Sequence, residues 1–189
     1  EPGIIIIGGR LPVVLQEDGF DNLEGGYEGK MPFALAYPNR PNMSKKTRSQ
    51  AIRKEYTKTI MELAEYGHKV VITYPIPEVG WDVPSEILKR FFIFNNQFSE
   101  KNFVTTSYEL YKERTKSTFK LLDEIKGDNI YRVYPHKLFC DTFIKSRCIT
   151  HNKDYIFYAD DDHPSIKGSV KINNLIIKEV ENIENNKNY

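Results

Sequence analysis

The sequence predicts an α/β protein with three layers, α/β/α, around a mainly parallel sheet. Two observations lead to this prediction. Several short segments are apolar at every position, which is typical of strands that are buried on both faces. Segments whose apolar residues recur at helical spacing separate them. In such a sheet, functional sites form beyond the carboxyl ends of the strands.

The first half of the chain contains two of these strands. Ile4–Ile7 is the first, and it runs into Gly8 and a glycine-rich loop over residues 19–29. Apolar residues at helical spacing then predict a helix from about Ser49, and Gly67 ends it in the usual place for glycine. The second strand covers residues 69–74 and stops at a proline-rich loop, PIPEVGWDVP.

The second half contains more helices than strands. Serines at positions 85 and 107 predict capped helix starts, for helices at 85–95 and 107–125. The remaining elements predicted by the pattern are strands at 130–133 and 155–158 and a last helix that begins near Ser165. The apolar residues of this last helix favour one packed face.

Length and charge exclude several classes of protein. A chain of 189 residues suits one domain with a proper core. The formal net charge of +1 gives no reason to expect a nucleic-acid partner. No apolar run reaches the length that a membrane span requires.

The two cysteines, Cys140 and Cys148, lie eight positions apart in LFCDTFIKSRC. They could close a small disulfide loop, which the chain-entropy model values at roughly 2.5 kcal/mol. Two free thiols are an equal alternative at this point. A zinc site is disfavoured because no second cysteine or histidine pair stands at ligand spacing.

The segment YADDDHPSIKGS, residues 158–169, has three interpretations. It could be a metal loop, although calcium loops require ligands at wider spacing and a glycine that is absent here. It could be an acidic turn that caps the last helix. It could also be an acid–base pair, because Asp160 and His163 are three positions apart and a carboxylate on one ring nitrogen leaves the other nitrogen to accept a proton.

Five blocks, taken in order, resemble one family across nearly the whole chain. They are IIIIGGR, FDNLEGG, PIPEVGWDVP, LFCDTFIKSRC and YADDDHPSIKGS. Together they resemble the SGNH (GDSL-like) hydrolase-type domains that are fused to the membrane acyltransferase-3 domain of bacterial O-acyltransferases, which modify O-antigen and other surface glycans. The resemblance implies an SGNH-hydrolase-like fold.

The resemblance also implies roles for individual residues. His163 would be the general base and Asp160 its orienting carboxylate, with Asp161 and Asp162 as capping or solvent-facing residues, or with the pairing shifted by one. Arg10 would contact substrate or the oxyanion, or form a structural salt bridge. Trp81 and Asp82 would fix their loop, with glycan contact as the minor alternative. The compartment would be periplasmic or otherwise extracytoplasmic, where a Cys140–Cys148 bridge persists.

One block of the family has no counterpart. No Gly-Asp-Ser occurs, and the one Gly-Asp, at Gly127, is followed by Asn129. Ser165 and Ser169 follow the histidine on the same helix start, in the wrong place for attack. We therefore expect residues 1–183 to be the C-terminal portion of one SGNH-like domain that lacks its first strand and nucleophile block, with a frayed tail at 184–189.

The leading functional hypothesis is an O-acyl transferase or esterase that acts on surface glycans through a Ser-His-Asp mechanism. The serine would lie upstream, a membrane acyltransferase domain would deliver the acyl donor, a glycan would accept it, and no cofactor or metal would take part. A second hypothesis is a catalytically incomplete remnant that binds a glycan or a partner. An α/β domain of unrelated activity is the third.

Overall fold

A three-stranded parallel sheet lies at the centre of the molecule. The computed structural model describes residues 1–30, 35, 37, 39–94 and 102–185. The sheet has the order β1-β2-β4, formed by Ile4–Ile7, Lys69–Thr73 and Ile130–Val133. Ile4 pairs with Lys69 and Val70 with Ile130, both in parallel register. The predicted parallel α/β architecture is therefore confirmed.

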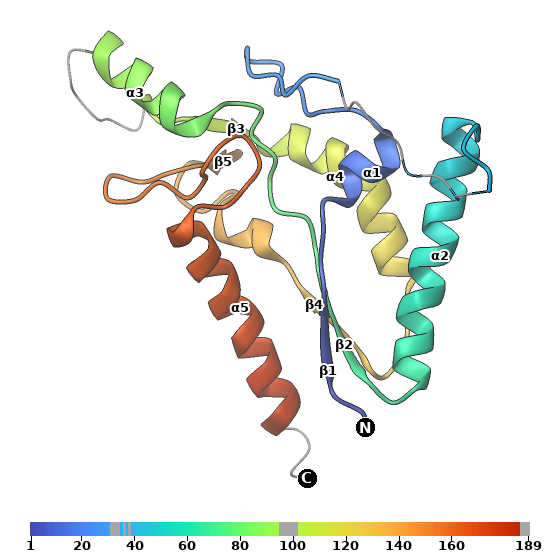
Figure 1. The fold of residues 1–189 in the computed structure, drawn as a ribbon. Coiled ribbons are helices and arrows are strands. Elements are labelled where there is room, and N and C mark those ends of the chain that lie inside the picture. The colour runs from blue at the N-terminus through green and yellow to red at the C-terminus, as the bar shows by residue number, and fades with distance from the viewer. Residues whose placement is uncertain (31–34, 36, 38, 95–101, 186–189) are drawn as a thin grey trace.

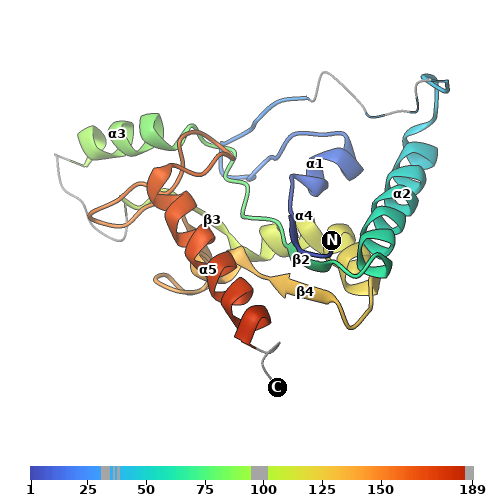
Figure 2. The ribbon, with the colours of Figure 1, turned by 60° about the horizontal axis from the view of Figure 1, so that its bottom comes forward.

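Helices cover both faces of this sheet, which makes the three layers (Figure 1). On one face, Val70 and Ile72 pack against α1 (Leu11–Gln16), α2 (Lys45–Glu65) and α4 (Tyr108–Glu124). On the other face, Val71 and Val133 pack against α5 (Ile166–Asn185). Figure 2 shows α5 on the side of the sheet opposite α2. Alternate residues of β2 therefore face opposite layers, so Val70, Val71 and Ile72 are all apolar and fully buried.

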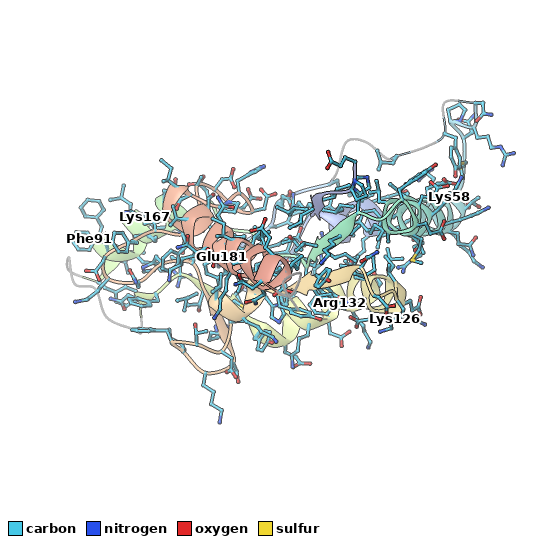
Figure 3. The ribbon with its side chains drawn as sticks, turned by 90° about the horizontal axis from the view of Figure 1, so that it is seen from below. Lys58, Phe91, Lys126, Arg132, Lys167 and Glu181 are labelled. Atoms are coloured by element: carbon cyan, nitrogen blue, oxygen red, sulfur yellow. A yellow bond between two sulfur atoms is a disulfide. The ribbon has the colours of Figure 1, made fainter. Side chains whose placement is uncertain are left out.

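A smaller unit extends from one side of the sheet. It contains α3 (Val83–Ile93) and the antiparallel strands β3 (Thr105–Ser107) and β5 (Arg147–Ile149), and the 3-10 helix η2 (Pro135–Leu138) leads into it from β4. Phe91 on α3 and Lys58 on α2 lie at opposite ends of the molecule (Figure 3). A second core, which includes Val104, Phe157 and Ile172, joins this unit to α5.

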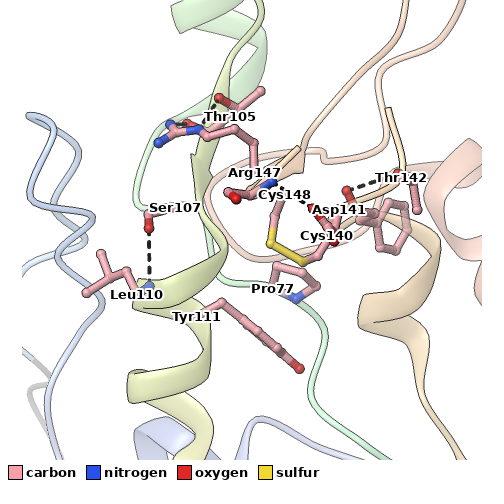
Figure 4. The surroundings of a disulfide bond; sticks show 12 residues. Pro77, Thr105, Ser107, Leu110, Tyr111, Cys140, Asp141, Thr142, Arg147 and Cys148 are labelled. Carbon is pink, nitrogen blue, oxygen red and sulfur yellow. Dashed lines mark hydrogen bonds between the residues drawn. A yellow bond between two sulfur atoms is a disulfide. The ribbon is translucent and has the colours of Figure 1, made fainter. Parts of the chain in front are cut away.

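The disulfide lies inside this unit. Cys140 and Cys148 are bonded, and they lie beside Pro77 and Tyr111 (Figure 4). Both cysteines are buried against Tyr111 of α4. The bridge thus ties β5 to the chain that leaves η2.

Several predicted elements differ in the structure. Residues 155–158 form no strand; they make only isolated bridges, such as Tyr158 with Pro164. Phe157 and Tyr158 are buried in a loop, where the Phe157 N–H donates to the Thr150 carbonyl and the Tyr158 hydroxyl to the Pro77 carbonyl. The prediction of a fourth strand there was wrong.

The helix starts were predicted with mixed success. Ser107 caps α4, as expected, because its hydroxyl accepts the Leu110 N–H. Asp82, and not Ser85, caps α3 by accepting the Ser85 N–H at 3.0 Å. The α2 helix begins at Lys45 behind a Ser44 cap, four residues before the predicted start.

Two predicted segments, the helix at 85–95 and the tail at 184–189, extend past the described residues. The predicted end of the 85–95 helix falls beyond Phe94, outside the described residues. The α5 helix continues to Asn185, so 184 and 185 of the expected tail are helical, and the rest of that tail lies outside the described residues. Within the described residues, no helix combines the length and the apolar character needed to cross a membrane.

Candidate functional site

The turn that carries His163 is built around one carboxylate. One oxygen of Asp160 accepts the backbone N–H groups of His163 at 2.7 Å and Asp162 at 3.0 Å. Its other oxygen lies 2.8 Å from Nδ1 of the His163 ring. When Nδ1 donates to Asp160, the lone pair of Nε2 is left available to accept a proton. The structure thus places Asp160 and His163 together, in the arrangement that their spacing predicts.

This turn is closed by backbone contacts on both sides. The Ala159 N–H donates to the His163 carbonyl, and the Ser165 N–H donates to the Phe157 carbonyl. The Ser165 hydroxyl donates to the Ile156 carbonyl at 2.6 Å, so it is not directed at the histidine. The first turn of α5 passes so close that a Cβ at Gly168 would lie 2.1 Å from the Phe157 carbonyl oxygen. Glycine is required there by backbone proximity.

Arg10 approaches the turn from the carboxyl end of β1. Its guanidinium forms ion pairs with Glu28, with Glu78 and, at 2.9 Å, with Asp162. Arg10 therefore forms the salt bridges that were one of its two expected roles, and it also lines the cleft beside His163. Burial alone would lower the pKa of Arg10. Its carboxylate partners outweigh this effect, so the pKa is raised above its ordinary value. Arg10 is a cation at every accessible pH.

A second arginine completes this group of charges. Arg114 of α4 donates to Glu78 at 2.6 Å, to Gln16 at 2.7 Å and to the Asp18 carbonyl at 2.8 Å. The side chains of Glu78 and Arg114 are 4% and 8% exposed. We call Arg10, Glu28, Glu78 and Arg114 the buried ion cluster. It links β1, the glycine-rich loop, the PIPEVGWDVP loop and α4 behind the histidine.

Asp162 differs from its sequence prediction. Its side chain is only 9% exposed, and it lies between Arg10 and the Nδ1 atom of His163, which is 3.0 Å away. It is therefore not a solvent-facing residue. Nothing in the sequence indicates its burial, because Asp160, Asp161 and Asp162 are consecutive and chemically alike. Only the fold of the turn distinguishes them.

Trp81 and Asp82 lie in the loop before α3, which touches the turn that carries His163, because the Val83 N–H donates to the Asp160 carbonyl at 3.4 Å. Asp82 is the cap of α3. Trp81 lies against Gly25 and Gly26, where added Cβ atoms would come within 3.2 Å and 2.8 Å of its ring. Arg90 stacks 5.4 Å above the same ring. Both residues hold the loop in place, and neither lines the cleft beside His163.

A cleft of about 320 Å³ opens beside His163. Its walls are the residues that follow β1 and β2 and the start of α5: Gly9, Arg10, Pro12, Thr73, Tyr74, Pro75, Ile76, Glu78, Asp162, His163, Pro164 and Ile172. It thus lies beyond the carboxyl ends of the parallel strands, where sites form in α/β sheets. No serine or cysteine of the described residues lines it.

Burial, hydrogen bonds and neighbouring charges shift the pKa values of Asp160 and Asp162 in opposite directions. Burial would raise the pKa of Asp160, but hydrogen bonds from two backbone N–H groups and the His163 ring lower it overall. Burial raises the pKa of Asp162 to about 6, against the opposing effects of Arg10 and His163. The hydrogen bond to Asp160 raises the pKa of His163, and the charge of Asp162 adds to this.

Two further histidines, His136 and His151, are buried, and their pKa values do not suit proton transfer at neutral pH. Burial lowers the pKa of His136 to about 4 and also lowers that of His151. His163, in contrast, is 73% exposed and has carboxylate partners. Its ring is the most accessible of the three.

Acidic groups close enough to hold a cation occur in the same turn. Asp160, Asp162 and His163 form one such group, and Glu28, Asp161 and Asp162 form another. Arg10 already occupies an oxygen of Asp162, and both Asp160 and Asp162 face Nδ1. The cluster alone does not identify a metal site.

Comparisons with known proteins give one family. The family model described as "SGNH domain (fused to AT3 domains)" matches residues 1–178. No curated protein matches the chain. Among solved structures, the chain is similar to the lipopolysaccharide acetyltransferase periplasmic domain of Salmonella ser. Paratyphi A. The identity is 13% and the TM-score 0.48, over 95% of this chain and 84% of that one.

Proposed function

The chain belongs to the SGNH domains that are fused to AT3 domains, and on this premise we propose that it transfers acyl groups to cell-surface glycans with His163 as the general base. Family membership supports a role of the acyltransferase or esterase type. The observation that carries the assignment to these residues is the Asp160–His163 contact of 2.8 Å at the mouth of a cleft beyond the sheet.

In the proposed reaction, a serine hydroxyl attacks the carbonyl carbon of an acyl ester. Nε2 of His163 accepts the hydroxyl proton and then returns it to the departing alkoxide, which leaves an acyl-serine. A sugar hydroxyl next loses its proton to Nε2 and attacks this ester. The acyl group passes to the sugar, and His163 returns the proton to the serine. Asp160 holds the ring tautomer and stabilises the imidazolium in both steps.

We assign the serine to a segment that precedes residue 1. Within the described residues, β1 pairs with β2 alone, and Ile6 on β1 is 51% exposed. The unpaired edge of β1 is thus available to a further strand, and it lies next to Gly9 and Arg10 at the cleft. A strand placed there would end beside His163, which is where a nucleophile is required.

The AT3 domain is the proposed source of the acyl group, and acetyl is the group we propose. The domain would then work on the outer side of the cytoplasmic membrane, where the Cys140–Cys148 bond is stable. Native protein should therefore contain no titratable thiol. Two free thiols in protein isolated under non-reducing conditions would contradict this location.

The test uses the complete natural protein and a fluorophosphonate probe that labels activated serines. We expect one labelled serine N-terminal to this chain, and we expect His163→Ala to abolish both labelling and hydrolysis of p-nitrophenyl acetate. Asp160→Asn should reduce the rate less than His163→Ala and more than Asp161→Asn.

Two results would contradict the proposal. Labelling at full rate in His163→Ala would remove the histidine from the mechanism. A protein without any labelled serine, but with retained affinity for the glycan, would favour the alternative of a binding remnant. The reverse order of Asp160→Asn and Asp161→Asn would mean that the histidine pairs with Asp161.

A further inference from the structure

Nδ1 of His163 faces two carboxylates. Asp160 Oδ2 lies 2.8 Å away and Asp162 Oδ1 lies 3.0 Å away. The second oxygen of Asp162 is 2.9 Å from Arg10 Nη1. Asp162 therefore forms a bridge from the arginine to the imidazole, a contact that a Ser-His-Asp arrangement does not require.

Asp162 is also the more buried of the two partners. Its side chain is 9% exposed, compared with 39% for Asp160. Arg10, the ion-pair partner of Asp162, is itself held in place, because Glu28 and Glu78 pair with the same guanidinium. Charges that are shielded from water interact more strongly, so a fixed Asp162 has more influence on the ring than its distance alone indicates.

We infer that Asp162 is a positioning residue that acts as a second carboxylate partner of His163, and that Arg10 keeps its oxygen directed at Nδ1. The catalytic consequence of this inference rests on the proposed function, but the contact itself does not. When the ring accepts a proton from a serine or a sugar, two carboxylates share the new positive charge. The nearby cation of Arg10 opposes permanent protonation, so the ring can release the proton again.

The charged and titratable groups around Asp162 come from several elements. Arg10 follows β1, and Asp160, Asp161 and His163 belong to the same turn. Tyr158 is buried nearby. Glu28 and Glu78 act through Arg10. Because burial raises the pKa of Asp162 to about 6, this carboxyl is mainly ionised at neutral pH and becomes protonated in mild acid.

The test is an NMR titration of the histidine rings in this chain. The chain has four histidines, and His163→Gln assigns the signal of interest. In the wild type we expect the neutral ring to carry its proton on Nδ1. In Asp162→Asn we expect the pKa of His163 to fall, because one negative charge at Nδ1 is lost. Asp160→Asn should lower it further, and Asp161→Asn, the matched control in the same turn, should leave it nearly unchanged.

Arg10 is tested by a double-mutant cycle. Arg10→Lys keeps the charge but loses the planar fork that contacts three carboxylates. It should move the His163 pKa toward the Asp162→Asn value and should have no further effect when Asp162→Asn is already present. Equal shifts in both backgrounds would mean that Arg10 acts on the ring independently, and would overturn its role as the holder of Asp162.

Activity gives a separate readout in the complete protein. There we expect Asp162→Asn to lower kcat by about 3- to 10-fold and leave KM unchanged, a small part of the roughly 10²- to 10⁴-fold due to a general base. A His163 pKa that is the same in Asp162→Asn and wild type, with the melting temperature preserved, would overturn the inference. A shifted pKa in a protein without a reactive serine would uphold the contact and reject the proposed function.

Discussion

Two sets of charged side chains meet at the cleft, and they differ in burial more than in chemistry. In the buried ion cluster, Glu78 and Arg114 are 4% and 8% exposed, and every guanidinium nitrogen of Arg114 has a partner. In the exposed pair, Asp160 and His163 are 39% and 73% exposed, and Nε2 faces away from both carboxylates. A charge surrounded by partners can hold loops together but cannot reach a substrate, whereas an exposed one can.

The comparison predicts opposite consequences for the two sets. Substitutions in the buried ion cluster should reduce the free energy of unfolding. Substitution of His163 should reduce activity and leave the fold intact, and so should Asp160→Asn, which keeps an oxygen to accept the backbone N–H groups of the turn.

The largest effect is expected for His163→Ala in the complete protein. We expect acyl transfer to fall by about 10⁴-fold or more, as for removal of other catalytic histidines. The free energy of unfolding should change by less than about 0.5 kcal/mol, because exposed side chains contribute little. Parallel rate measurements and urea denaturation would check both parts. A large loss of stability would mean that this side chain also supports the fold.

A loss of about 3 kcal/mol is expected for Glu78→Gln, because it leaves Arg10 and Arg114 without a shared buried anion. Urea denaturation of this chain would measure it. The matched control is Glu113→Gln on the exposed face of α4, whose partner Lys116 is 75% exposed. The control should cost less than about 0.5 kcal/mol. Equal effects at the two sites would end the distinction between the cluster and the surface.

A smaller effect, of about 1–2 kcal/mol, is expected for Arg114→Lys. The charge is kept, but an ammonium cannot reproduce the fork that reaches Glu78, Gln16 and the Asp18 carbonyl together. Thermal unfolding would detect the change. An unaltered melting temperature would show that charge alone, and not geometry, maintains the cluster.

The fourth prediction concerns pH. The pKa of Asp162 is raised to about 6 in the fold, so between about pH 4 and 6 the native chain holds a proton there that the unfolded chain has lost. The stability of the wild type should therefore decrease relative to Asp162→Asn as the pH rises through this range. Denaturation curves at pH 4, 5 and 6 would measure it. An increase over the same interval would contradict the raised pKa.

The sequence predicted the central sheet well because each of its strands has a simple signal. Ile4–Ile7 is continuously apolar, the second strand is apolar over Val70–Ile72, and both are strands in the structure. The same signal failed at Phe157 and Tyr158, which are buried in a loop whose backbone groups bond elsewhere. An apolar run indicates that a segment is buried. It indicates a strand only where the backbone also pairs with a neighbouring strand.

The antiparallel strands were missed for the opposite reason. Thr105–Ser107 and Arg147–Ile149 are short and partly polar, so neither has a detectable pattern. Their pairing depends on residues about forty positions apart, which no local spacing can indicate. The α1 helix was missed as well, since it has only six residues.

The site shows the same division between local and distant information. The Asp160–His163 contact is local, so three-residue spacing was enough to predict it. Glu78 and Arg114 are 36 positions apart and meet only through the fold. Glu78 did leave one trace, a lone carboxylate among apolar and proline residues in PIPEVG. A charge in such a setting is a reason to look for a buried partner.

Gly168 shows how a residue outside the chemistry can govern the reaction. Any side chain there would collide with the Phe157 carbonyl, 2.1 Å from the added Cβ, and would push α5 away from the turn that it follows. In a saturation mutagenesis screen scored by growth or product, position 168 would tolerate as few residues as position 163. A map of intolerant positions would then mark two residues alike, although one exchanges protons and the other only leaves room.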